Sequence, residues 1–471
     1  MKKIRSTTDS LGVEKSVRPG NYLADAFAQV AMNSITGLVG LLVFVYTDKV
    51  GMAAGTAGLA IFLAKIVDAF TDLVMGPLVD RTNTRWGKAR PWFLWMALPA
   101  AVVVPLLFTV PSGASDGTQL AWALGTNILA TGVVATALGI PYAVLMVYAT
   151  KSSQERGSRG LFRAIAGFLA GAVLSIFAVP LSNMLGGDQA AWQKLGIAFG
   201  VIAGLASLIV FLGTRERNEV AAESSTEAAP PVREGLLFLL RNPYWVKLLI
   251  FGLLANMVWG LGGASGVYWA KWVMGDENIV ALLGTVGLLP YVVGFAAIGP
   301  LNKRFGLTNV LRWSLVLTVV SFVIRSLAPA NLTVVLVGGA LGGLGGIAMM
   351  VNTIVLVSLI AEWNELKFGH NLAGLNASAS NFGGKIGAGV GAAMIGWILA
   401  ATAYDPSLPA QETPAYLGIL AFSMWIPGLL ALIQWLLLWR FDLEKIYPGV
   451  IAELEERRAA ARADAAAVAA E

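Results

Sequence analysis

Apolar segments that are long enough to cross a membrane recur along the whole of this 471-residue chain. A transmembrane helix needs about 20 consecutive, mostly apolar residues. Charged residues make up only 13% of the chain, about half of their usual share in soluble proteins. We therefore expect an all-α membrane protein with twelve transmembrane helices. The expected spans are residues 21–47, 53–79, 92–110, 118–149, 161–183, 193–213, 244–272, 279–301, 310–328, 331–361, 371–402 and 413–440.

Positive charge is concentrated in alternate connections between these spans. Lys and Arg precede the first span and follow the second, fourth, sixth and eighth, whereas loops 111–117, 184–192, 274–278, 329–331 and 403–412 hold almost none. Loops rich in Lys and Arg face the cytoplasm. We therefore expect a multi-pass protein of the cell inner (plasma) membrane, embedded in the lipid bilayer, with both termini cytoplasmic. The net charge of +5 follows from this bias and does not indicate nucleic-acid binding.

The chain divides into two halves around one long polar segment. Residues 214–240 are rich in Pro, Ala and charged side chains, which is typical of a linker. The sequence GPLVDR at residues 76–81 is similar to GPLNKR at residues 299–304, after the second and eighth spans. Two six-span halves with matching loops predict two pseudo-symmetric six-helix bundles, the plan of the major facilitator fold. We expect bundles at 1–213 and 241–442, a cytoplasmic linker at 214–240, and a tail at 443–471 that is a cytoplasmic helix or disordered.

The second apolar segment carries Lys65, Asp68 and Asp72. Their spacing of i, i+3 and i+7 places them on one face of a helix. Charged side chains inside a bilayer are costly and usually serve ion coupling or proton relay. This face therefore predicts a site for a cation or a proton in the N-terminal bundle.

The sequence KIVDAFTDLVMGPLVDRTNTRWGKARP at residues 65–91 resembles the signature of the glycoside-pentoside-hexuronide:cation symporters, which the melibiose carrier typifies. Weaker similarities to motifs of this family lie elsewhere in the chain. They are Tyr46-Thr47-Asp48, Ile140-Pro141-Tyr142, Gln154-Glu155-Arg156 leading to Phe162-Arg163, Glu362-Trp363-Asn364-Glu365 and Asn381-Phe382-Gly383-Gly384-Lys385.

The resemblance implies a role for each matching residue in cation binding. Asp68 and Asp72 match the acids that coordinate the coupling cation, and Thr136 matches a threonine that adds a hydroxyl oxygen. Na⁺ is a hard cation that takes several oxygen ligands, and without Na⁺ one carboxylate could hold a proton. Lys65 matches a basic residue that can neutralise the acids. No resident cofactor is implied; the coupling cation is Na⁺ or H⁺.

For the solute, the resemblance places Arg163 near the sugar and Lys385 where a lysine can pair with the acids in place of the cation, with Asn381 in the same motif. Asp25 matches an acid near the start of the first span. The loop after the second span resembles the cytoplasmic gating loop of the fold. Its charged residues are Asp80, Arg81, Arg85, Lys88 and Arg90, and we expect Asp80 to pair with basic groups or helix N-termini.

The chain departs from the melibiose carrier at the sugar. The two acids that hold the galactoside there fall at Met32 and Gly139, so a melibiose-like pocket is not expected. With Arg163 and Lys385 kept, the charge balance favours uronides or other acidic glycosides over neutral galactosides. Lys271, near the outer end of the seventh span, is interpreted as a lysine whose amine extends to the membrane surface.

These features predict a cation-coupled secondary symporter that imports a sugar, glycoside or uronide by alternating access. One alternative is a sodium-coupled carrier of a lysolipid or another amphiphile. A second, from another class, is a transport-inactive membrane sensor, although no large output domain follows the spans. The chain has no cysteine and a single histidine, so we find no nucleophile–base pair and do not expect an enzyme.

Overall fold

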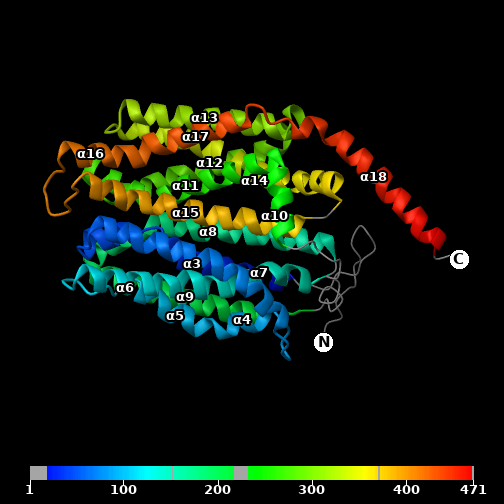
Figure 1. The fold of residues 1–471 in the computed structure, drawn as a ribbon. Helices are drawn as coiled ribbons and strands as arrows, with labels where there is room; N and C mark the ends of the chain where they lie inside the picture. The colour runs from blue at the N-terminus through cyan, green and yellow to red at the C-terminus, as the bar shows by residue number, and fades with distance from the viewer. Residues whose placement is uncertain (1–18, 151, 217–231, 370–371, 469–471) are drawn as a thin grey trace. The chain divides into compact units, whose positions relative to one another are not determined.

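The computed structural model describes residues 19–150, 152–216, 232–369 and 372–468. The basic N-terminal residues, most of the predicted linker and the last residues of the predicted tail lie outside these ranges. The described residues form helices that run alongside one another within each part of the chain (Figure 1). Apart from an isolated bridge between Thr84 and Gly87, the described ranges contain no β-structure.

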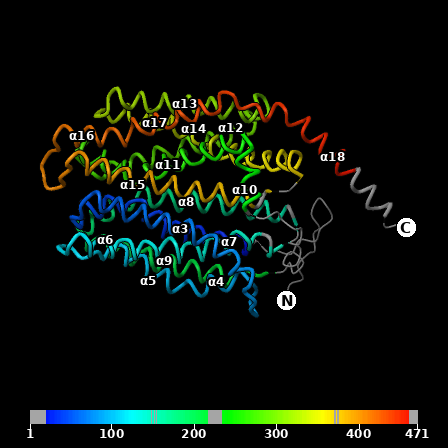
Figure 2. Tube along the Cα trace, viewed as in Figure 1, coloured from blue at the N-terminus to red at the C-terminus, as the bar shows by residue number. Residues whose placement is uncertain are grey.

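The helices follow the predicted spans closely, and the trace of the chain can be followed in Figure 2. In the first part they are α1 (Pro19–Val39), α2 (Leu42–Phe44), the π-helix η1 (Val45–Lys49), α3 (Ala54–Arg81), α4 (Arg90–Trp95), α5 (Ala97–Leu106), α6 (Asp116–Asn127), the π-helix η2 (Ile128–Ala135), α7 (Thr136–Tyr148), α8 (Ser153–Met184) and α9 (Gln189–Gly213). In the second part they are α10 (Val232–Arg241), α11 (Pro243–Val273), α12 (Ile279–Phe305), α13 (Leu307–Leu327), α14 (Leu332–Phe368), α15 (Ala373–Ala401), α16 (Thr413–Leu420), the π-helix η4 (Ala421–Trp425), α17 (Ile426–Leu438) and α18 (Leu443–Val468).

Nine helices of the described chain are long and apolar enough to cross a membrane, and the bent pair formed by Gly20–Val39 and Leu42–Lys49 makes a tenth. The second and third predicted spans are missing from this set. Helix α3 has 28 residues but carries Lys65, Asp68 and Asp72 near its middle. The third span is divided into α4 and α5, of 6 and 10 residues. An all-α membrane fold is thus confirmed, whereas the count of twelve spans stays a prediction.

Contacts between residues divide the chain into two compact units. Unit 1 comprises Met1–Thr226, Trp259–Thr285 and Ala388–Ser423, and unit 2 comprises Glu227–Val258, Val286–Gly387 and Met424–Glu471. Unit 1 therefore includes two segments from the later half of the sequence. The predicted bundles at 1–213 and 241–442 remain a prediction.

The internal repeat in the sequence has a structural counterpart in each unit. After α3, Gly87 has a φ of 108°, and the Glu216 carboxylate accepts hydrogen bonds from the backbone N–H groups that follow, those of Lys88, Ala89 and Arg90, at 2.9, 2.8 and 2.8 Å. Orphan N–H groups at a helix start are stabilised by such a negatively charged acceptor. Glu216 thus ties the start of α4 to the end of α9.

Unit 2 repeats this arrangement after α12. Gly306 has a φ of 81°, and the Glu444 carboxylate accepts from the backbone N–H groups of Leu307 and Thr308 at 2.7 and 2.8 Å. Because a positive φ favours glycine, the first turn depends on Gly87 and the second on Gly306. Each half of the sequence therefore fastens the helix after its GPL segment with a glutamate that follows its last predicted span.

The tail beyond α17 is helical as far as Val468. Helix α18 packs on the end of α14 through the buried side chains of Leu366, Val450 and Leu454. The Tyr447 hydroxyl also donates a hydrogen bond to the Glu362 carboxylate. Burial, followed by this hydrogen bond, raises the pKa of Tyr447 to about 12. The contacts explain why this charged segment forms a helix on the surface of unit 2.

Candidate functional site

Helix α3 brings the charged side chains of the second span to one face, as their spacing predicts. Asp68 is buried, with 3% of its surface exposed. The Lys65 ammonium donates to Asp68 Oδ2 at 3.0 Å. Asp72 lies one turn further along α3 and is half-buried. The three side chains carry two negative charges and one positive charge in a part of unit 1 that is mostly apolar.

Thr136, at the start of α7, joins the two acids. Its hydroxyl lies 3.2 Å from Asp68 Oδ1, 2.9 Å from Asp72 Oδ1 and 3.2 Å from the backbone carbonyl oxygen of Thr131. A hydroxyl has one proton and can donate to only one of these acceptors at a time. Oxygens from both carboxylates and from the Thr131 carbonyl therefore surround the Thr136 hydroxyl, between α3 and the η2–α7 span.

The π-helix η2 explains the position of Thr136. The wider turns of a π-helix leave room for side chains to bond with backbone groups, and such segments occur frequently at functional sites. This span packs against α3 at Gly132, where a Cβ atom would make ordinary van der Waals contact with the Thr71 hydroxyl at 3.5 Å and with the Cα atom of Asp68 at 3.7 Å. Sequence reasoning missed η2 and the Thr131 carbonyl; a small, polar Thr-Gly pair within an apolar span was the available signal.

This group of atoms suits a small monovalent cation as transported cargo. Oxygen donors are the ligands that hard cations prefer. Lys65, Asp68 and Asp72 sum to a single negative charge when all three are ionised. One monovalent cation would balance that charge, because uncompensated charge in a membrane interior is costly. The described residues contain no group of three or more Asp, Glu, His or Cys side chains suited to a multivalent metal.

Asp25 and Arg163, which the sequence places near the solute, bind each other. Asp25 is fully buried on α1. Its carboxylate accepts from Arg163 Nε at 2.6 Å and Arg163 Nη2 at 2.8 Å, and also from Arg159 Nη2. Arg163 donates further to the Tyr142 carbonyl at 2.9 Å, and its guanidinium lies 3.6 Å from the centre of the Tyr142 ring.

These contacts change the charge count on which the argument from the sequence rests. Asp25 holds Arg163 with two hydrogen bonds, but it shares its carboxylate with Arg159, so the three side chains together carry one positive charge. The sequence also missed Arg159, which is 2% exposed and shares the same carboxylate. A lone Arg residue one helical turn before Arg163 was the available signal.

Lys385 and Asn381 lie on α15, in the portion that belongs to unit 2. Lys385 is half-buried and Asn381 is exposed. The acids of the cation site belong to unit 1, and the pairing of Lys385 with these acids stays a prediction.

The predicted gating loop is held mainly by its backbone. Asp80, Arg81 and Arg85 are exposed, and the Arg85 guanidinium lies 4.6 Å from the centre of the Trp86 ring. Arg90 donates through Nε to the Phe211 carbonyl at 2.6 Å. Within the described chain Asp80 forms no ion pair. The acid that binds a helix N-terminus here is Glu216, which the sequence did not single out.

Comparison with known proteins agrees with this architecture. Residues 22–445 match the model of the family described as MFS/sugar transport protein. The isoprimeverose transporter of Lactiplantibacillus pentosus is 31% identical over 89% of this chain and 87% of its own length. The putative glycoside/cation symporter YagG of Escherichia coli (strain K12) is 30% identical over 79% of this chain and 80% of its own.

Solved structures show the same fold. A bacterial homolog of the human lysosomal transporter Spinster, in an inward-facing and unoccupied conformation, superposes with a TM-score of 0.63 at 13% identity, covering 94% of this chain and 99% of its own. The major facilitator fold expected from the sequence is thereby confirmed. With its family model matched over residues 22–445, the chain belongs to the MFS/sugar transport protein family, within which it resembles the glycoside-pentoside-hexuronide:cation symporters.

Proposed function

We propose that this protein is a cation-coupled symporter that imports a sugar or glycoside, with its cation bound between Asp68, Asp72 and Thr136. The observation that carries the proposal is the convergence of both carboxylates on the Thr136 hydroxyl, at 3.2 and 2.9 Å. Symport of a glycoside with a cation is supported by the names of two relatives, an isoprimeverose transporter and a putative glycoside/cation symporter. Those names do not favour an amphiphile carrier or a sensor.

Charge balance gives a physical basis for coupling. With Lys65 paired to Asp68, the cation supplies the positive charge that the face of α3 lacks. A bound cation neutralises the net negative charge on this face of α3. The carrier can then pass through the conformation in which the site is closed to water on both sides at a lower free-energy cost. Solute and cation then increase each other's affinity by the same factor. Na⁺ is the cation that the four convergent oxygens favour, and a proton on one carboxylate is the competing choice.

The Arg163–Asp25 pair bears on whether the transported sugar is neutral or acidic. Asp25 shares its single negative charge between Arg159 and Arg163, so the three side chains keep one net positive charge that is already partly paired, and neutral glycosides and uronides are both candidates. Competition by a neutral glycoside and by its uronic acid, measured on uptake of one labelled sugar, separates them. Equal competition would remove the preference for acidic solutes.

The decisive test of the cation site is Asp72→Asn in the full-length protein reconstituted in proteoliposomes. Loss of one carboxylate should abolish accumulation driven by a Na⁺ gradient and leave solute exchange measurable. Asp116→Asn is the matched control, because Asp116 lies exposed at the start of α6. Concentrative uptake that persists in both Asp68→Asn and Asp72→Asn would refute the site.

The ion is identified by the same assay with Na⁺, Li⁺ or a proton gradient as the only driving force. A melting-temperature screen of purified protein against sugars and uronides, with and without Na⁺, identifies the solute class, since a specific ligand stabilises the folded state by mass action. A shift that depends on both ligands together supports symport.

We also propose that the charged loop after α3 controls the rate of the conformational change at the cytoplasmic side. Its exposed acid and arginine, Asp80 and Arg85, form no ion pair with another described residue and are available to exchange partners during the cycle. Asp80→Ala or Arg85→Ala should slow turnover and leave solute affinity within a few-fold of its original value. An unaltered turnover rate would limit these charges to a role in membrane orientation.

A further inference from the structure

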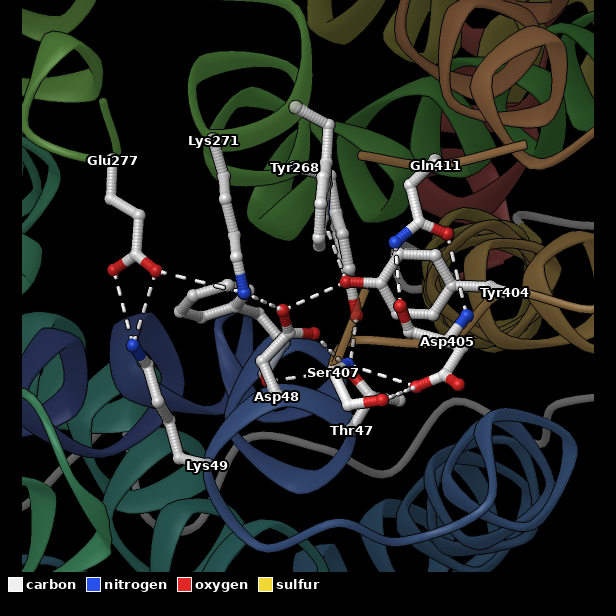
Figure 3. A network of polar contacts seen from close by, with 12 residues as sticks. Thr47, Asp48, Lys49, Tyr268, Lys271, Glu277, Tyr404, Asp405, Ser407 and Gln411 are labelled. Carbon is white, nitrogen blue, oxygen red and sulfur yellow. Dashed lines mark hydrogen bonds and ion pairs between the residues drawn. The ribbon is translucent and has the colours of Figure 1, made fainter. Parts of the chain in front are cut away.

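Another buried acid, Asp48 in η1, is the centre of a polar network in unit 1 (Figure 3). The side chain of Asp48 is fully buried. Its Oδ1 atom accepts from the Lys271 ammonium at 2.5 Å and from the Tyr404 hydroxyl at 2.8 Å, and its Oδ2 atom accepts from Thr47 at 2.7 Å. A buried carboxylate is tolerated only when it is paired and hydrogen-bonded in this way.

The network extends on both sides of Asp48. Lys49 donates to both carboxylate oxygens of Glu277 at 3.1 and 3.2 Å, and Glu277 lies 3.9 Å from Lys271. The charges of the two lysines and two acids cancel. Lys271 therefore does not extend its amine to the membrane surface as interpreted from the sequence, because that amine is bound to Asp48 (Figure 3).

A hydroxyl bridge adds a further connection. The hydroxyl groups of Thr47 and Tyr268 lie 2.6 Å apart. Tyr404 in turn accepts from Trp272 Nε1 at 2.8 Å. The end of the first predicted span is thus bound to the end of α11 and to the segment after α15, both of which come from the later half of the sequence.

The helices that lead to this network pack with their backbones in contact. A Cβ atom on Gly263 of α11 would lie 2.6 Å from the Gly40 carbonyl oxygen, and one on Gly58 of α3 would lie 2.8 Å from the Ala393 carbonyl oxygen of α15. Neither position tolerates a larger side chain without movement of a helix. While these contacts hold, no solute can pass between Gly40 and α11 or between α3 and α15 at these points.

We propose that the Asp48 network is the lock of the outer gate: it holds the extracellular end closed and must break before solute enters. This inference rests on the proposed function and orientation, in which loops 274–278 and 403–412 are extracellular. A network of this kind suits repeated opening. The Coulomb energy of a buried ion pair is largely cancelled by its desolvation cost, so water can replace the contacts when the ends separate, at little net cost.

The test uses the absence of cysteine from the chain, which makes any introduced pair of thiols unique. The Lys49→Cys/Glu277→Cys pair is joined with a short, reducible thiol crosslinker in the purified full-length protein before reconstitution. Uptake depends on the population of the outward-open state. Crosslinking should lower that population, and therefore uptake, by at least about tenfold. Cleavage of the crosslinker should restore it.

The matched control is the Glu453→Cys/Arg457→Cys pair on α18, which replaces an exposed ion pair of 2.7 Å. Crosslinking there should leave uptake unchanged. If the Lys49→Cys/Glu277→Cys protein transports equally well with and without the crosslink, the lock is refuted. If this protein and the unmodified chain both lack cation-driven uptake, the proposed function fails instead.

A second measurement tests Asp48 itself. Asp48→Asn, placed in the Lys49→Cys/Glu277→Cys background, should slow crosslinking because the gate is open for more of the time. Tyr404→Phe removes only one hydroxyl donor, so the protein should still fold. It should also slow crosslinking, but by a smaller factor than Asp48→Asn. A crosslinking rate that is unchanged in Tyr404→Phe would overturn the role of Asp48 as the central acceptor.

Discussion

At the scale of single residues, three acids of unit 1 with buried side chains share one property: each is held by more than one donor. Asp25 binds two arginines, Asp48 binds a lysine and two hydroxyls, and Asp68 binds Lys65 and Thr136. A buried charge that keeps no partner costs several kcal/mol. Removing one member of such a group therefore leaves its partner unpaired. A single replacement should lower the stability of the protein more than a double replacement that removes both partners.

Asp25→Asn tests this directly. The change leaves Arg159 and Arg163 buried without an opposing carboxylate, and breaking a buried pair costs about 3–5 kcal/mol. We expect a clear fall in the melting temperature of the purified protein, and a partial recovery in Asp25→Asn/Arg163→Gln. If Arg163 serves only as a sugar ligand, Arg163→Gln will weaken solute binding while Asp25→Asn leaves the melting temperature unchanged.

Thr136→Ala removes the hydroxyl that lies between the two acids. The loss of one ligand or hydrogen bond to a charged group is worth about 1.5–3 kcal/mol, so the half-saturating Na⁺ concentration for uptake should rise about tenfold or more. Thr136→Ser should stay near the original value. Thr126→Ala is the control, since the Thr126 hydroxyl donates to the backbone carbonyls of Trp122 and Ala123 in α6 and its other bonding partner is Tyr46; a similar rise there would show a general packing effect.

At the scale of helices, the two glutamates that follow α9 and α17 perform the same task in their own units. Charge-assisted hydrogen bonds to helix N-termini are stronger than neutral ones, and loss of a cap costs about 0.5–2 kcal/mol. Glu216→Ala and Glu444→Ala should each lower the melting temperature by a similar amount. Glu412→Ala is the matched control, because Glu412 precedes α16 without a side-chain cap; an equal effect there would contradict the argument.

Features that depend on neighbouring residues of one helix can be predicted from sequence alone, whereas contacts between distant segments cannot. The length of an apolar run and the spacing of residues on one helix face are local patterns, so the spans and the shared face of Lys65, Asp68 and Asp72 could be predicted from the sequence. Glu216 and Asp48 could not be interpreted in this way. The partners of Asp48 lie 223 and 356 positions away, and only the tertiary fold brings them together. The π-helix η2 leaves no mark on apolar periodicity, so the Thr131 carbonyl was missed too.

At the scale of the whole molecule, the distribution of Lys and Arg predicts the orientation of every loop at once. The positive-inside rule acts on short loops near the ends of spans, and loops 82–89 and 403–412 differ sharply in this respect. If both halves follow the rule, the charged loop after α3 is cytoplasmic and the segment after α15, which carries Tyr404, is extracellular. An experiment that determines the orientation of these two loops therefore also tests whether the Asp48 network lies at the extracellular end.

Because the chain has no cysteine, single thiols report orientation without background. Asn83→Cys and Ser407→Cys both lie at exposed positions, in the loop after α3 and in the segment after α15. In intact cells a membrane-impermeant maleimide should label Ser407→Cys and leave Asn83→Cys unlabelled, and lysis should make both react. The cysteine-free parent is the control for nonspecific labelling. The reverse pattern would place the Asp48 network at the cytoplasmic end, where it would close the exit for solute instead of the entrance, so the assignment of the outer gate depends on this result.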